Sequence, residues 1–322
     1  MVPRFRLAMA ALCLLAACSG TAASPSTSND PPSATVDVPT TVPAVAEAPR
    51  EQFDLAYATQ STAQRLDIRL PPEGQGPFPL IVWVHGGGWE RGDRGLHPQH
   101  PALALVTAGY AVASIDYRLR SEAIFPAQIA DVKAAIRYLR ANAAALRIDP
   151  TRIGAWGDSA GGHLVALLGT SGDVAPFDDP ALGNQGYSSR VQAVVDWYGP
   201  ASFTTFDTQL AADQCAKRIA GSESTESRLV GASIAVRPDL ARAASPITYV
   251  SADDPPFLIE QGKKDCAVPW QQSQELADSL AATIGAPNAT LVLFDDAQHG
   301  GAEFASASNV NRIVSFFDAH LR

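Results

Sequence analysis

The sequence predicts an α/β domain with a mostly parallel central sheet and helices on both faces. From about residue 50, short apolar runs rich in β-branched residues alternate with segments of helical periodicity. Such runs are typical of strands buried in a parallel sheet, and the alternation is typical of α/β proteins. The apolar share of 46% supports a sizeable core, which excludes a fibrous or wholly disordered chain.

Before this domain, the first residues have the layout of an export signal. Arg4 and Arg6 precede an uncharged apolar run over residues 7–17, which is too short for a membrane-spanning helix of about 20 residues. The sequence Leu15-Ala16-Ala17-Cys18 resembles a bacterial lipobox, in which cleavage precedes the cysteine and its thiol receives a lipid. Residues 1–17 are therefore interpreted as a lipoprotein signal peptide and Cys18 as the lipidated residue. Cleavage by signal peptidase I near residues 22–24 is the alternative, and it would give a secreted or periplasmic protein.

Residues 18–50 are rich in Ser, Thr, Pro and Ala and show no periodicity. Such a segment buries too little apolar area to offset the entropy of ordering it, so we expect a disordered tether to a membrane of the cell envelope. Residues 51–322 then form one folded domain. The formal charge of -9 would repel a phosphate backbone, so nucleic acid is not an expected partner.

The expected strands begin with an antiparallel entry hairpin and continue as parallel strands. The hairpin strands are 52–57 and 64–70. The parallel strands are 80–85, 110–116, 152–158, 191–198, 256–262 and 290–294.

Helices are expected between and after the parallel strands, at 101–108, 126–146, 160–169, 271–284 and 310–321. In the second of these, Ile129, Val132 and Ile136 recur at helical spacing and give one apolar face to the sheet. The stretch of about 200–250 breaks the alternation of strands and helices. Its length and its Ala and Ser content predict a helical, lid-like insertion before the strand that leads to the acid described below.

The first motif that indicates catalytic chemistry is Gly157-Asp158-Ser159-Ala160-Gly161. It follows an expected strand and opens an expected helix, which is the context of the nucleophile elbow G-x-S-x-G. The flanking glycines allow a tight turn that projects the Ser159 hydroxyl. An ordinary turn at a helix start is the alternative when the motif is taken alone.

A glycine-rich loop, His85-Gly86-Gly87-Gly88-Trp89, lies at the carboxyl end of another strand. Acyl transfer places negative charge on the carbonyl oxygen, and each preorganised amide stabilises that charge by roughly 3–4 kcal/mol. We expect the amides of Gly87, Gly88 and Ala160 to form the oxyanion hole. A phosphate cradle is the weaker alternative, because the loop lacks both the P-loop ending and the G-x-G-x-x-G spacing.

A serine nucleophile needs a neutral imidazole to accept its proton and an acid to orient that imidazole. His299, in a glycine-flanked loop past the last strand, is the expected base. The other histidines are expected in loops, in the elbow helix or near the end of the chain: His85, His97, His100, His163 and His320. Because the base must be neutral, activity should fall as the pH falls through about 6–7.

Asp265 is the expected acid, because it follows the strand ending at residue 262 and completes the chain order Ser, Asp, His. Asp295 and Asp296 are the alternatives, since they lie nearer to His299 in the sequence. Asp116 and Asp158 are expected to organise turns.

Taken together, six segments resemble the bacterial feruloyl-esterase-like branch of the α/β-hydrolases, which is close to hormone-sensitive-lipase-type esterases. The segments are 85–89, 114–119, 125–127, 157–163, 265–269 and 299–300. The resemblance covers about residues 60–320 and implies an α/β-hydrolase fold, with Ser159, Asp265 and His299 as the triad and Gly87, Gly88 and Ala160 as oxyanion donors. Lys263 and Lys264 depart from the usual acid loop.

These observations predict a serine carboxylic-ester hydrolase that forms an acyl-enzyme and needs no metal or organic cofactor. Family members cleave simple short-chain esters or acetyl and feruloyl esters of carbohydrates, so a small-molecule or oligosaccharide ester is the expected partner. An amidase, such as an aryl formamidase or a peptidase, is the alternative enzyme. A non-catalytic binding protein on an esterase scaffold is the competing class. The oligomeric state is not predicted.

Aromatic and cysteine residues complete the predictions. Trp89, Trp197 and Tyr198 follow strand ends and are expected to line the acyl or alcohol pocket. In an exported protein, Cys215 and Cys266 suggest a disulfide between the insertion and the acid loop. Two separate buried thiols are the alternative.

Overall fold

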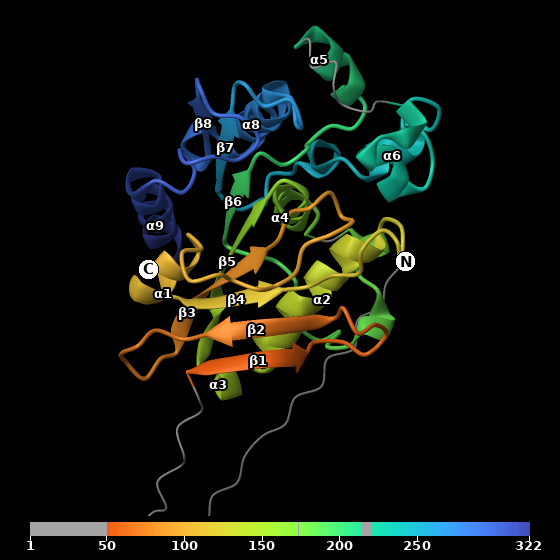
Figure 1. Cartoon of the computed structure of the whole chain (residues 1–322). Helices are drawn as coiled ribbons and strands as arrows, with labels where there is room; N and C mark the ends of the chain where they lie inside the picture. The colour runs from red at the N-terminus through yellow and green to blue at the C-terminus, as the bar shows by residue number, and fades with distance from the viewer. Residues whose placement is uncertain (1–49, 173, 214–220) are drawn as a thin grey trace, which may run out of the picture. The chain divides into compact units, whose positions relative to one another are not determined.

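The chain folds around one mixed sheet of eight strands within residues 50–172, 174–213 and 221–322, the parts that the computed structural model describes (Figure 1). The strand order is β1-β2-β4-β3-β5-β6-β7-β8. β1 (Glu51–Ala56) pairs antiparallel with β2 (Arg65–Arg69), and β2 pairs antiparallel with β4 (Ala111–Ile115). The expected entry hairpin is therefore confirmed.

The other strand pairs are parallel, as the apolar runs predict. The remaining strands are β3 (Phe78–Val84), β5 (Ile148–Asp158), β6 (Ala193–Trp197), β7 (Phe257–Gly262) and β8 (Ala289–Phe294). β5 begins four residues earlier than expected, because Ile148 pairs with Phe78 across a register shift in the β3–β5 ladder.

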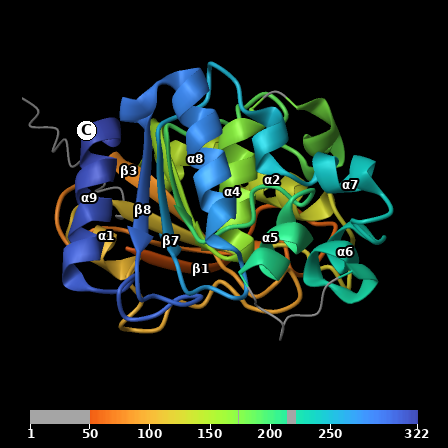
Figure 2. The ribbon, with the colours of Figure 1, turned by 90° about the horizontal axis from the view of Figure 1, so that it is seen from above.

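Helices cover both faces of the sheet (Figure 2). One face is covered by α2 (Ala127–Ala141), α4 (Ala160–Thr170) and α8 (Trp270–Ile284), and the other by α1 (Leu103–Thr107) and α9 (Ala307–Leu321). Side chains of β3 alternate accordingly. Leu80, Val82 and Val84 pack into the first core, and Ile81 and Trp83 into the second.

The helix expected over 126–146 is in fact two helices, α2 and the short α3 (Ala143–Leu146). The break is at Asn142, where ψ is 15°. Its side-chain Nδ2 donates to the carbonyl oxygen of Tyr138 at 2.8 Å. Asn side chains compete for backbone groups in this way, which weakens a helix at that point.

The stretch of about 200–250 is helical, as expected. It contains α5 (Phe206–Ala212), α6 (Thr225–Val230) and α7 (Pro238–Ala243), with 3-10 turns at Gly221–Glu223 and Pro246–Tyr249. We call it the insertion. Ser224 begins α6 by accepting a hydrogen bond from the Ser227 amide at 3.1 Å, and Gly231 ends it in the left-handed conformation.

Several predictions fall on residues outside the described parts: the signal peptide 1–17, Cys18, nearly all of the tether 18–50, and Cys215. The residues from Glu47 to Arg322 form one compact unit. Across the described residues, no helix combines the length and the apolar character that crossing a membrane requires.

Candidate active site

Ser159 lies at a sharp turn between β5 and α4. Its backbone has φ 54° and ψ -116°, a conformation that non-glycine residues rarely adopt and that the surrounding structure must enforce. The turn packs too tightly for side chains at its two glycines. A Cβ on Gly161 would lie 2.0 Å from the Val84 carbonyl oxygen, and a Cβ on Gly157 would lie 2.5 Å from the Gly161 carbonyl. The motif therefore has the geometry of a nucleophile elbow.

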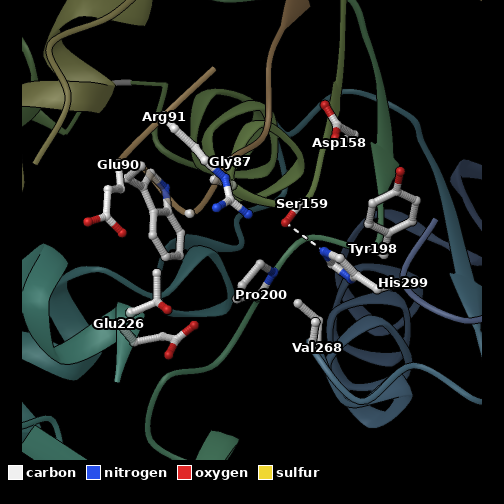
Figure 3. Close-up of a pocket in the computed structure, with 15 residues that line it drawn as sticks. Gly87, Glu90, Arg91, Asp158, Ser159, Tyr198, Pro200, Glu226, Val268 and His299 are labelled. Carbon is white, nitrogen blue, oxygen red and sulfur yellow. Dashed lines mark hydrogen bonds between the residues drawn. The ribbon is translucent and has the colours of Figure 1, made fainter. Parts of the chain in front are cut away.

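His299 connects Ser159 to Asp265 through two short hydrogen bonds. Its Nε2 lies 2.8 Å from Ser159 Oγ (Figure 3), and its Nδ1 lies 2.7 Å from Asp265 Oδ2. A carboxylate only accepts hydrogen bonds, so Nδ1 donates to Asp265 and Nε2 is left to accept from the serine hydroxyl. The structure thus brings together the three residues that the sequence nominates as a triad.

Asp265 is 2% exposed and is held rigidly by its own loop. Its Oδ1 accepts hydrogen bonds from the amides of Ala267 at 2.7 Å and Val268 at 2.9 Å. Gln261 Nε2 donates to its Oδ2 at 3.0 Å. These partners orient the carboxylate toward His299.

The two lysines of the acid loop are neutralised by the alternative acids. Lys263 pairs with Asp295 at 2.7 Å, and Lys264 pairs with Asp296 at 2.5 Å, in positions open to solvent. Within the described residues, neither Asp295 nor Asp296 hydrogen-bonds His299. The lysines therefore face these two carboxylates and leave Asp265 to the imidazole.

The glycine-rich loop crosses the front of the elbow with backbone angles that require glycine. Gly87 has φ +102° and Gly88 has φ +65°. A Cβ on Gly87 would lie 2.2 Å from the Arg91 carbonyl oxygen. Asp158, beside Ser159, accepts a hydrogen bond from the Gly86 amide at 2.8 Å and so ties the loop to the elbow. Burial raises the pKa of this carboxyl.

A cavity of about 460 Å³ opens above Ser159 (Figure 3). Gly87, Gly88, Ala160 and His299 line it together with the serine. The expected pocket residues Trp89 and Tyr198 also line it. The rest of its lining comes from the loops at Glu90 and Arg91, from Asp158, from the insertion and from the acid loop: Pro200, Thr225, Glu226, Ala267 and Val268.

Trp197 is not in this lining, and its assignment to the pocket was wrong. Its ring packs in the core against Trp156, 4.8 Å between centroids, and its Nε1 donates to Glu260 Oε2 at 2.6 Å. Successive side chains of a strand point to opposite faces, so the last residue of β6 follows the core pattern. Tyr198, the residue after the strand, has φ 45° and stacks on Trp197 in the same core, and it also lines the cavity. Its ring meets His299 edge-on at 4.8 Å.

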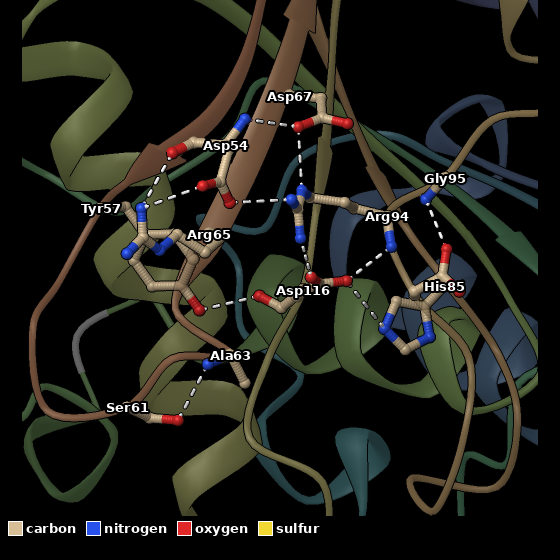
Figure 4. Close-up of polar contacts among 11 residues, drawn as sticks. Asp54, Tyr57, Ser61, Ala63, Arg65, Asp67, His85, Arg94, Gly95 and Asp116 are labelled. Atoms are coloured by element: carbon tan, nitrogen blue, oxygen red, sulfur yellow. Dashed lines mark hydrogen bonds and ion pairs between the residues drawn. The ribbon is translucent and has the colours of Figure 1, made fainter.

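A polar cluster behind the glycine-rich loop was missed by sequence reasoning (Figure 4). Arg94 bonds three carboxylates: Nε to Asp67 at 2.8 Å, Nη2 to Asp54 at 2.9 Å, and Nη1 to Asp116. The Arg94 amide also donates to Asp116 at 2.5 Å. These four residues come from four separate strands or loops, and no spacing links them. Of the four, only Asp116 could be singled out from the sequence, because it lies at the end of an expected strand.

Two of the other histidines stabilise segments that carry the site, namely the glycine-rich loop and α4. His85 stacks on Tyr117, whose hydroxyl donates to the His85 carbonyl oxygen at 3.0 Å. His163, in α4, donates through Nε2 to the Ala244 carbonyl oxygen at 2.7 Å, which connects the elbow helix to the insertion. Burial lowers the pKa of His163 to about 4, so it is neutral at physiological pH. Among the described residues, no group of three or more His, Cys, Asp and Glu is arranged to hold a metal.

Known proteins share this fold and this sequence pattern. The BD-FAE family model matches residues 66–280. The esterase LipC of Mycobacterium tuberculosis is 33% identical over 221 residues, which is 68% of this chain and 53% of LipC. The esterase LipQ of the same organism is 34% identical over 241 residues, which is 72% of this chain and 54% of LipQ. The chain thus spans about half the length of these curated relatives.

Solved structures match over most of the chain. A truncated form of a carbohydrate esterase from gut microbiota superposes with a TM-score of 0.75 and 32% identity, covering 86% of this chain and 98% of that one. A propionate-bound thermophilic esterase of the Planctomycetes species Thermogutta terrifontis has a TM-score of 0.66 and 25% identity, covering 85% and 95%. The family match covers well over half of the chain and includes the elbow and the acid loop. The chain therefore belongs to the BD-FAE family and has the α/β-hydrolase fold.

Proposed function

We propose that this protein is a serine carboxylic-ester hydrolase that works through an acyl-enzyme. The observation that carries the proposal is the continuous hydrogen-bonded line from Ser159 Oγ through His299 to Asp265, at 2.8 and 2.7 Å. It lies at a strained elbow, beside a glycine-rich loop and in a cavity open to substrate. The esterase names of the relatives support the same activity.

Each residue of the line has a defined role in the proposed reaction. His299 accepts the hydroxyl proton while Ser159 attacks the ester carbonyl carbon, and it then gives the proton to the departing alcohol. Asp265 holds the imidazole in the required tautomer and stabilises its positive charge. Water, activated by the same imidazole, then releases the acid and restores Ser159.

The oxyanion of each tetrahedral intermediate is assigned to the amides of Gly87, Gly88 and Ala160. All three residues line the cavity with Ser159, and Ala160 is the residue after the nucleophile. Because the loop and the first turn of α4 are held by packing, these donors need little reorganisation when charge develops.

Short-chain acyl esters and carbohydrate-linked acetyl or feruloyl esters are the proposed substrates. A cavity of about 460 Å³ that is open to solvent suits a small acyl group attached to a larger alcohol. Similarity to a carbohydrate esterase and to a propionate-bound esterase supports both classes.

Ser159→Ala tests the proposed activity. The variant should lose nearly all hydrolysis of 4-nitrophenyl acetate and of acetylated and feruloylated oligosaccharides, and it should no longer react with a fluorophosphonate probe. Ser315→Ala, on an exposed position of α9, is the matched control and should behave as the unmodified protein. Undiminished turnover by Ser159→Ala would refute the proposal. Cleavage of aryl formamides or aminoacyl amides in preference to esters would favour an amidase.

We also propose that the protein is exported and anchored in the cell envelope by a lipid on Cys18. The support is the sequence: a basic start, an uncharged apolar run and the lipobox-like ending. Metabolic labelling with an alkyne fatty acid should mark the full chain but not Cys18→Ala. Equal labelling of both would place any lipid elsewhere.

A disulfide between Cys215 and Cys266 is proposed on the same basis of export. Cys266 directly follows the acid, so the bond would tie the insertion to the acid loop. A thiol titration of the denatured, unreduced residues 47–322 should find no free thiol. Two free thiols would exclude the bond.

A further inference from the structure

The charged residues around the cavity differ in whether the fold already neutralises them. Glu90 forms an ion pair with Arg120, and this contact lowers the pKa of the Glu90 carboxyl. Asp158 is buried and accepts the Gly86 amide. Glu226 is 1% exposed and has an interaction of its own. The carboxylates of the lining are thus engaged by the protein.

Arg91 differs from these carboxylates. It lines the cavity, is exposed, and its guanidinium forms no hydrogen bond or ion pair within the described parts of the chain. Among the described lining residues it is the one basic side chain besides His299. Figure 3 shows the guanidinium reaching from the Gly87 side toward Ser159.

The backbone turn at Arg91 positions the base of this side chain. The amides of Glu90 and Arg91 both donate to the Gly87 carbonyl oxygen at 3.2 Å, which closes a tight turn. The turn directs Glu90 to Arg120 on one side and Arg91 into the cavity on the other. The cation is therefore attached to the same loop that is proposed to supply the oxyanion donors.

We infer that Arg91 selects ester substrates that carry a carboxylate near the scissile bond. A guanidinium matches a carboxylate with two parallel N–H donors, and such charge-assisted pairs are stronger than neutral hydrogen bonds. The chain as a whole is acidic, with a formal charge of -9, so its overall field does not attract an anion. The attraction has to come from a cation at the site. This inference rests on the proposed esterase function.

Two pairs of esters test the inference and distinguish which part of the substrate bears the charge. For the acyl side, 4-nitrophenyl hydrogen adipate is compared with its neutral methyl ester. For the alcohol side, 4-carboxyphenyl acetate is compared with 4-carbamoylphenyl acetate. The readout is the ratio of kcat/KM for the charged ester to that for its neutral partner, which cancels any general loss of activity.

The ratio should fall about tenfold or more in Arg91→Gln in one of the two pairs, and Arg91→Lys should restore part of it. It should also decrease for the unmodified protein as NaCl is raised. Arg237→Gln, an exposed arginine of the insertion that pairs with Asp239, is the control and should keep the original ratio. The pair of esters whose ratio falls in Arg91→Gln shows whether the carboxylate is on the acyl or the alcohol side of the substrate.

Two results would overturn the inference in distinguishable ways. If the unmodified protein cleaves the neutral esters but the ratio is the same in Arg91→Gln for both pairs, Arg91 does not select anions and the esterase function stands. If none of the esters is cleaved by the intact protein, the proposed function fails and this inference fails with it.

Discussion

Asp265 and Asp296 offer a direct comparison at the scale of single residues. Both lie near His299 in sequence or in space, but only Asp265 is buried and bonded to the imidazole; Asp296 is exposed and pairs with Lys264. Asp265→Asn would present an N–H where Nδ1 now donates, which favours the wrong tautomer of His299. We expect kcat for 4-nitrophenyl acetate to fall by about 10³–10⁴-fold.

Asp296→Asn should change kcat for the same ester less than about threefold, because an exposed ion pair contributes little. Circular dichroism spectra of both variants should match that of the unmodified protein. If the two substitutions reduce kcat equally, Asp265 is not the orienting acid.

Asp196, in β6, predicts a pH effect on stability. It is fully buried, accepts the Gly199 amide at 2.9 Å, and has a second oxygen without a hydrogen-bond partner in the described parts. Burial raises its pKa from 3.8 to about 7. Between about pH 4 and pH 7 the unfolded carboxyl is ionised while the folded one holds its proton, so stability falls as the pH rises.

Asp196→Asn removes this titration and keeps an oxygen for Gly199. The difference in unfolding free energy between the variant and the unmodified protein should therefore grow in favour of the variant by a few kcal/mol from pH 5 to pH 8. Urea unfolding at the two pH values measures this gain. An identical difference at both pH values would show that Asp196 does not titrate in this range.

At the scale of elements, the Arg94 cluster predicts a link between the edge of the sheet and catalysis. Arg94 connects β1 and β2, through Asp54 and Asp67, to the loop that carries Gly87 and Gly88. Arg94→Met would leave neighbouring carboxylates without their cation and loosen the loop. We expect kcat to fall about tenfold with little change in KM, because the loss lies in positioning the oxyanion donors.

Arg65→Met is the matched control for Arg94→Met. The Arg65 side chain also pairs with Asp54, at 3.5 Å, but within the described residues it forms no hydrogen bond with the side chains of Asp67 or Asp116. The Arg65 carbonyl oxygen accepts the Asp116 amide at 2.9 Å, a backbone contact that the substitution leaves in place. Its replacement should leave kcat within about twofold of the original value. Equal losses in the two variants would mean that general destabilisation, rather than loop position, reduces the activity.

At the scale of the whole molecule, the compact unit predicts how much of the chain is needed. The unit begins at Glu47, and Arg50 already bonds into it, with Nη2 donating to the Gly74 carbonyl oxygen at 3.1 Å and its carbonyl accepting from Leu70. A protein of residues 47–322 should therefore keep the thermal midpoint and the kcat/KM of the full chain for a soluble ester.

A protein of residues 58–322 is the informative comparison for that truncation. It lacks β1, so the edge of β2 is exposed and Arg94 loses Asp54. Its thermal midpoint should drop by several degrees. Loss of activity already in residues 47–322 would show that the N-terminal segment contributes to the site.

Much of this architecture could be predicted because it depends on local patterns. Buried parallel strands need continuous apolar runs, and the strand-to-helix turn at Ser159 needs glycines at 157 and 161, so both appear in the sequence itself. The order of Ser159, Asp265 and His299 likewise follows from their positions after successive strands. The fold class, the order of elements and the residues proposed for the chemistry could therefore be inferred before any coordinates were known.

Other features depend on contacts between segments that are distant in the chain, so they could be identified in the folded molecule alone. Trp197 and Tyr198 both pack in the second core, but of the two only Tyr198 also lines the cavity, since β6 ends between them. Arg94 meets Asp54, Asp67 and Asp116 across separate strands. The direction of Arg91 depends on a turn that closes onto Gly87. A side chain's partners are set by which segments pack beside it, and that packing has no period or spacing along the chain.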